Sequence, residues 1–130
     1  MGDSSANKRE NRVNHRVFLK TPIPVEIGSI GSTVRYTLET RDISDRGFFL
    51  DFERPGRFPF NPASILEVWL HLTPDEVIFF NGKMARVVYP ADEKGHLTQP
   101  GIAITLVQME LDQKEKYMKY LAESPSRVPV

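Results

Sequence analysis

The chain has 130 residues, of which 40% are hydrophobic, and its 17 Lys and Arg residues balance 17 Asp and Glu residues. This length and composition fit one domain with a single core, and the neutral balance disfavours a general nucleic-acid-binding protein, whose domain is usually basic. The chain has no cysteine, which excludes disulfides and thiolate chemistry.

The first twenty residues carry a local excess of positive charge. Residues 1–11 are small and polar, so we expect a flexible N-terminal arm. No apolar run approaches the roughly 18 residues that span a bilayer, and the start lacks the apolar segment of a signal peptide, so we expect a cytoplasmic protein with no membrane span. The positive charges of the first twenty residues indicate a binding site for a small anionic ligand or, alternatively, a solvated tail. These charges belong to Lys8, Arg9, Arg12, Arg16 and Lys20.

Strand patterns fill the middle of the chain. Pro22 and Pro24 keep residues 17–29 extended and away from helix. From residue 33 onward, apolar and polar residues alternate with period two, which is typical of strands with one dry face. The Asn81-Gly82 pair between two of these runs indicates either a hairpin turn or a bulge. The strand candidates are residues 33–40, 47–52, 65–72, 77–80, 84–89 and 101–107.

The pattern changes to helical spacing near the C-terminus. Asp112 is a plausible N-cap with Glu115 as its capping-box partner, and Pro125 ends the run. Six short strands and one terminal helix favour an all-β fold, a closed or nearly closed six-stranded antiparallel β-barrel with a C-terminal α-helix. The apolar residues at helical spacing are Tyr117, Met118 and Leu121.

Two short motifs lie about thirty residues apart. Arg12-x-x-x-Arg16 is followed by the pattern D-x-S-x-x-G, formed by Asp42, Ser44 and Gly47 at the start of a strand. Together, in a short all-β chain, they resemble the PilZ domain, a bacterial receptor for cyclic di-GMP. The resemblance covers roughly residues 8–123, and it includes the last strand and the C-terminal helix.

The resemblance implies a PilZ-like β-barrel at residues 12–123, followed by a C-terminal tail at 124–130. It also implies a cyclic di-GMP receptor that changes conformation and signals to an unidentified protein partner in motility, biofilm or exopolysaccharide control. The alternative is an interaction adaptor on the same fold that binds no ligand. A barrel for single-stranded nucleic acid is disfavoured, because most aromatic residues lie in apolar runs.

The motif residues have side chains that suit such a ligand. An arginine can fork two N–H donors onto guanine O6 and N7, or pair with a phosphate. Asp42 can accept hydrogen bonds from the guanine N1–H and N2–H₂ edge, the Ser44 hydroxyl can donate or accept, and Gly47 lets a base approach the backbone. The plainer interpretation is that Asp42, Ser44 and Gly47 are only turn and bulge residues.

By resemblance, Arg12 and Arg16 contact guanine and phosphate, and Asp42, Ser44 and Gly47 form the barrel side of the site. Lys8, Arg9 and Arg46 are candidates for additional ligand contacts. Two residues depart from the family pattern: Arg46 stands where a small residue is common, and Ala103 replaces a frequent glycine. Asn11 precedes Arg12 at a position that, in the family, is thought to influence whether one ligand molecule or a stacked pair binds.

An enzyme is not expected. The histidines His15, His71 and His96 are scattered without metal-ligand spacing, and no phosphate-binding glycine loop or nucleophile elbow occurs. We therefore expect no metal and no cofactor. The stretch HLTPDE at 71–76 indicates a turn, and we expect Trp69, on the polar face of its strand, to pack against the protein rather than face the ligand.

Overall fold

The computed structural model describes residues 16–52, 57–89, 94–95 and 100–123. Within them lie six strands and one helix, α2 (Leu111–Glu123). The predicted arm at 1–11 and tail at 124–130 fall outside the described residues. The strands are β1 (Val17–Ser29), β2 (Tyr36–Ser44), β3 (Gly47–Asp51), β4 (Ile65–Thr73), β5 (Glu76–Val88) and β6 (Gly101–Gln108).

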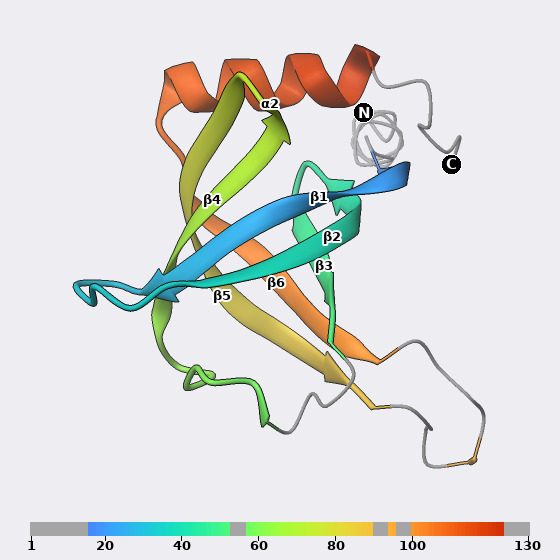
Figure 1. Cartoon of the computed structure of the whole chain (residues 1–130), viewed down its shortest axis with the longest axis vertical. Coiled ribbons are helices and arrows are strands. Elements are labelled where there is room, and N and C mark those ends of the chain that lie inside the picture. The colour runs from blue at the N-terminus through green and yellow to red at the C-terminus, as the bar shows by residue number, and fades with distance from the viewer. Residues whose placement is uncertain (1–15, 53–56, 90–93, 96–99, 124–130) are drawn as a thin grey trace, which may run out of the picture.

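The strands form a closed antiparallel barrel in the order β1-β2-β3-β6-β5-β4, with β4 pairing back onto β1 (Figure 1). This confirms the predicted six-stranded barrel with a C-terminal helix. The alternating pattern explains the core, because every second residue of β4 points inward. Leu66, Val68 and Leu70 are fully buried, and burying such side chains contributes about 1.5–3 kcal/mol each.

Two details of the strand prediction were wrong. Residues 17–29 are not merely extended but form β1, which pairs with both β2 and β4. The candidates at 77–80 and 84–89 are one continuous strand, β5, so Asn81-Gly82 is not a hairpin turn.

The bulge interpretation of Asn81-Gly82 is closer to the structure, because the β5–β6 register shifts at this pair. Asn81 pairs with Gln108 and Gly82 with Leu106, which leaves Val107 as the extra residue on β6. A Cβ at position 82 would lie 2.8 Å from the Ile104 side chain. Close approach of two strands, and not a chain reversal, explains this glycine.

Helix α2 lies across one end of the barrel (Figure 1). Tyr117 and Leu121 enter the core from it, and the Tyr117 ring stacks on Phe80 with centroids 6.3 Å apart. The side chain of Gln113 accepts the backbone N–H of Phe79 at 2.8 Å, which ties α2 to β5. Among the described residues, no helix is long and apolar enough to cross a membrane.

The predicted N-cap of this helix was off by two residues. The Glu110 carbonyl accepts the N–H of Lys114 at 2.9 Å, so the helical hydrogen bonds begin at Glu110 and not at Asp112. Asp112 lies in the first turn, where its negative charge still complements the helix dipole.

Aromatic residues cluster at the end of the barrel opposite α2. The segment that leaves β3 returns Phe58 and Phe60 to the core, with ring centroids 5.3 Å apart. Phe58 contacts Phe52 at 5.5 Å, and Phe60 contacts Tyr36 at 5.4 Å. Helix α2 thus covers one end of the barrel, and these rings pack against the core at the other.

Candidate functional site

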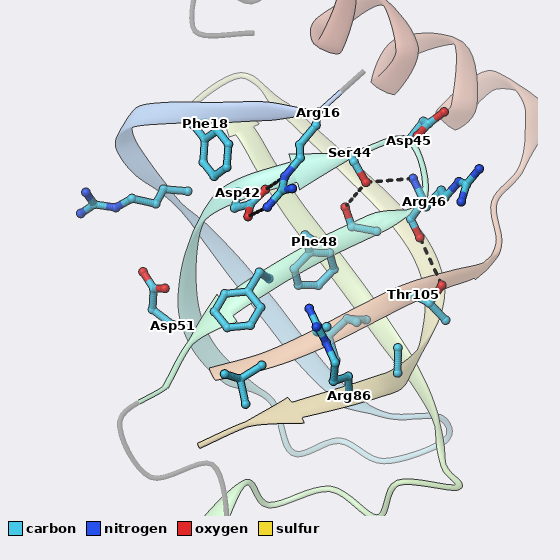
Figure 2. Close-up of a pocket in the computed structure, with 17 residues that line it drawn as sticks. Arg16, Phe18, Asp42, Ser44, Asp45, Arg46, Phe48, Asp51, Arg86 and Thr105 are labelled. Carbon is cyan, nitrogen blue, oxygen red and sulfur yellow. Dashed lines mark hydrogen bonds and ion pairs between the residues drawn. The ribbon is translucent and has the colours of Figure 1, made fainter. Parts of the chain in front are cut away.

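A pocket of about 970 Å³ lies on the outer wall of the barrel, over β2, β3, β6 and β5. Four arginines and three aspartates line it together with apolar and small residues, as Figure 2 shows. The lining residues are Arg16, Phe18, Arg41, Asp42, Ser44, Asp45, Arg46, Gly47, Phe48, Phe49, Asp51, Ala85, Arg86, Val88, Ala103, Ile104 and Thr105.

The predicted site residues that the structure describes all meet at this pocket. Asp42 and Ser44 end β2, and Gly47 begins β3, so the second motif spans a tight turn and does not merely start a strand. Arg16 and Arg46 line the same pocket. The other candidates, Lys8, Arg9 and Arg12, lie outside the described residues.

Arg16 and Asp42 form a two-pronged ion pair at one side of the pocket (Figure 2). Arg16 Nε donates to Asp42 Oδ1 at 3.1 Å, and Nη2 donates to Oδ2 at 2.8 Å. These hydrogen bonds raise the pKa of the Arg16 guanidinium, which stays charged at every physiological pH. The guanidinium also lies 4.7 Å from the centroid of the Phe18 ring, a distance at which a cation is attracted to an aromatic face.

The ion pair leaves both partners with capacity for a ligand. A guanidinium has five N–H donors, and two of them bind Asp42, so three remain. The Asp42 carboxylate likewise has acceptor sites beyond the two that Arg16 occupies. Because the Arg16 side chain is 51% exposed, its free edge can present a planar fork to a base or a phosphate.

A β-bulge in β2 turns Asp42 outward. Thr40 pairs with Leu50 and Asp42 with Phe49, so Arg41 is the extra residue. Regular alternation would place Asp42 inside the barrel after the buried Thr40, whereas the bulge sends both Arg41 and Asp42 to the pocket.

The Thr40 hydroxyl stabilises this bulge. It accepts the Asp42 N–H at 3.2 Å and donates to the Phe49 carbonyl, which compensates for the interrupted ladder. Thr40 is fully buried, and it is the only buried polar residue among those described. The sequence analysis did not single it out, and a threonine in a strand gives no signal of such a role.

The turn between β2 and β3 is built around Ser44. The Ser44 hydroxyl accepts the Arg46 N–H at 3.2 Å and lies 3.4 Å from the Gly47 carbonyl (Figure 2). Gly47 has a φ of +155°, and a methyl group there would overlap the Ile104 carbonyl oxygen of β6. The plainer interpretation of these residues as turn-formers therefore describes the backbone correctly, while the turn itself lies at the pocket wall.

The turn is fastened to the rest of the barrel from two sides. The Arg46 carbonyl accepts the Leu106 N–H at 2.7 Å and the Thr105 hydroxyl at 3.3 Å, both from β6. From α2, the Tyr117 hydroxyl donates to the Ser44 carbonyl at 2.6 Å. Burial raises the pKa of Tyr117, so this hydroxyl keeps its proton as a donor.

Several pocket residues escaped the sequence analysis, notably Phe49 and Arg86. Phe49 follows Gly47 by two residues on β3, but the sequence analysis gave it no role. Arg86 lies on β5, and only the strand register brings it to the motifs. Trp69 does not line the pocket but packs against Phe79 at 5.1 Å and under the Arg35 guanidinium at 3.7 Å, in line with the expectation of packing. No group of three or more His, Cys, Asp or Glu side chains in the described residues is placed to hold a metal.

Comparisons with known proteins agree with the barrel. Three similar solved structures share 13–19% identity, which supports the fold alone. The PilZ domain of CeSA from a cellulose-synthesizing bacterium has a TM-score of 0.56 and 14% identity, over 83% of this chain and 95% of that one. The PilZ domain of YcgR from Escherichia coli, solved with c-di-GMP, has a TM-score of 0.57 and 13% identity, over 86% and 89%.

The third structure is larger than this chain. The MrkH–c-di-GMP complex of K. pneumonia has a TM-score of 0.62 and 19% identity, over 87% of this chain but only 51% of that one. A search of curated proteins finds no match. The model of the PilZ domain family matches residues 10–123, which is most of the chain. The chain therefore belongs to the PilZ domain family.

Proposed function

We propose that this chain is a bacterial, cytoplasmic receptor for cyclic di-GMP that binds the ligand in the pocket above the β2–β3 turn. The observation that carries the proposal is the Arg16–Asp42 ion pair, which presents a partly exposed arginine fork beside Ser44 and Gly47. Cyclic di-GMP offers two guanines and two phosphates, and both groups match an arginine fork. Structures of two similar folds, from YcgR and MrkH, contain this ligand.

Asp42 prepares Arg16 for the ligand. It fixes one edge of the guanidinium, so less side-chain entropy is lost when the other edge binds a guanine or a phosphate. Arg12, four residues earlier on the chain, completes the family pattern and supplies a second cation. Lys8, Arg9 and Arg46 extend the positive charge around an anionic ligand.

The output of such a receptor is a change of conformation that a protein partner detects. The protein would act without catalysis and without a cofactor. That partner would act in the control of motility, biofilm formation or exopolysaccharide. The second candidate function is an adaptor on the same barrel that binds no ligand. The paired arginine in an open pocket favours the receptor, because a bare adaptor has no need of that arrangement.

Calorimetric titration with cyclic di-GMP and with GTP tests the proposal. We expect binding of cyclic di-GMP, and Arg16→Ala should weaken it by about 1–3 kcal/mol, or about 5- to 140-fold. Arg57→Ala is the matched control, since Arg57 is exposed and lies outside the pocket. Absence of binding, or equal binding by the Arg16→Ala protein, would refute the proposed site.

Salt gives a second test, because the ligand is anionic. Affinity should fall between low and moderate ionic strength as the Debye length shortens from about 30 Å at 0.01 M to about 8 Å at 0.15 M. An affinity independent of salt would contradict the phosphate part of the contact.

A further inference from the structure

The pocket floor is a single row of side chains that crosses five strands. The register pairs Phe18 with Asp42, Asp42 with Phe49, Phe49 with Ala103, and Ala103 with Arg86. Strands lie about 4.8 Å apart, so about 14 Å of sheet separates the backbones of Asp42 and Arg86. The motif residues occupy only one end of this row, and an unassigned arginine occupies the other.

A second β-bulge places Arg86 on this row. Met84 pairs with Ile104 and Arg86 with Ala103, so Ala85 is the extra residue. Regular alternation after the half-buried Met84 would turn Arg86 into the barrel. The bulge instead exposes both Ala85 and Arg86 and returns Val87 to the core. The bulges of β2 and β5 thus each turn two consecutive residues toward the same pocket, from opposite sides. β-Bulges often re-aim side chains at binding sites.

The Arg86 guanidinium is available for a ligand. Figure 2 shows it rising from β5 on the side of the pocket opposite Arg16. Within the described residues it forms no hydrogen bond or ion pair with another side chain. Arg16 is already held by Asp42, so the two arginines differ: one is fixed in advance, and the other is free to adapt.

The floor between the two arginines suits a flat base. A Cβ at Gly101 would lie 2.6 Å from two atoms of the Phe49 ring, so this glycine lets the ring rest against β6. Next along β6, Ala103 contributes only a methyl group and leaves room above the sheet. A half-buried aromatic ring beside a small residue offers a stacking surface, which purine bases use at about 1–3 kcal/mol each.

We propose that Arg86, with Phe49 and Ala103 as its floor, forms a second guanine subsite that reads the base left uncovered by the Arg16–Asp42 corner. Its guanidinium donates two hydrogen bonds to O6 and N7 of that guanine, and the base lies over Phe49 and Ala103. The inference rests on the proposed function. It adds a reason why the protein should bind a ligand with two guanines more tightly than a ligand with one.

The test compares cyclic di-GMP with the hybrid cyclic dinucleotide that contains one guanine and one adenine. Adenine presents an amino donor where guanine presents the O6 acceptor, so an arginine fork rejects it. The unaltered protein should prefer cyclic di-GMP by about 5- to 140-fold. In Arg86→Ala that preference should fall close to one, because the hybrid can place its only guanine at Arg16. Arg86→Lys keeps the charge but replaces the planar fork with a compact ammonium, so it should retain only part of the preference.

Lys83→Ala is the matched control, since Lys83 is an exposed cation on the same strand outside the pocket; it should leave affinity and preference unchanged. If Arg86→Ala weakens both ligands equally, Arg86 contacts phosphate and the guanine subsite is refuted. If Arg16→Ala impairs binding while Arg86→Ala does not, this inference alone fails. If the unaltered protein binds neither ligand, the proposed function fails with it.

Discussion

Replacing Tyr117 with Phe tests whether the helix supports the site. The substitution removes only a hydroxyl group, because the ring can keep its place against Phe80. That hydroxyl donates to the Ser44 carbonyl at 2.6 Å from a side chain that is 1% exposed, so no bulk water replaces it.

The size of the effect follows from the lost hydrogen bond. A typical hydrogen bond contributes about 0.5–1.5 kcal/mol net, and a buried acceptor left without its donor costs about 1–3 kcal/mol. We therefore expect the free energy of unfolding to fall by about 1–2 kcal/mol, which lowers Tm by roughly 4–8 °C in a domain of this size. Ligand affinity should also fall, since the Ser44 turn loses one of its two attachments.

Urea unfolding followed by the fluorescence of Trp69, the one tryptophan, measures the stability, and calorimetry measures the affinity. Tyr120→Phe is the matched control on the same helix, because within the described residues the half-buried Tyr120 hydroxyl forms no hydrogen bond. Equal losses in the two variants would refute the importance of the Ser44 contact. A stability loss without any change in affinity would show that Tyr117 supports the fold and not the site.

Three further predictions concern pH, Gly47 and Thr40. Burial raises the pKa of Tyr117 above its ordinary value of 10.0, so above about pH 10 the unfolded chain releases a proton that the folded chain retains. The free energy of unfolding should therefore fall at high pH by up to about 1.4 kcal/mol per pH unit, and urea titrations between pH 9 and 11 should show a shallower fall in Tyr117→Phe. Gly47→Ala should lower the free energy of unfolding by about 3 kcal/mol or more, because the methyl group would overlap a carbonyl of β6. Gly31→Ala, with a φ of +80° and open space around it, should lower it by only about 1–2 kcal/mol. Equal losses of the two variants in denaturant unfolding would contradict the overlap. Thr40→Val should lower the free energy of unfolding by about 1–3 kcal/mol and weaken ligand binding, because it releases the bulge that presents Asp42. Thr40→Ser keeps the hydroxyl and should preserve both stability and binding. A Ser variant as impaired as the Val variant in calorimetry would refute the role of the hydroxyl.

Local patterns in the sequence were sufficient for the fold class, although they missed β1 and divided β5 into two strands. The period-two alternation of β4 identified its buried face residue by residue, and the D-x-S-x-x-G motif brought Asp42, Ser44 and Gly47 to one turn because they are only a few residues apart. Arg16 could be linked to that turn only through the family resemblance, since its partner is 26 residues away.

Register and bulges lay beyond sequence reasoning. The row from Asp42 to Arg86 depends on three separate strand pairings, and a slip of one residue in any of them would move a side chain to the other face. Nothing in MARVVY distinguishes a regular strand from one with an extra residue at Ala85. For the same reason Asn81-Gly82, a strong local hairpin signal, was overruled by the pairing of β5 with β4 up to Lys83 and with β6 from Asn81 onward.

The closure of the barrel limits how a partner protein can recognise this molecule. Each of the six described strands is hydrogen-bonded to a neighbour on both sides over part of its length, so none of them is an edge strand from end to end that an incoming peptide could extend. In the proposed receptor, a signalling partner would then contact mainly side chains, either those on the convex wall or those on the outer face of α2. Recognition by side chains responds to the charge of an occupied pocket, so a bound nucleotide can itself become part of the surface that the partner recognises.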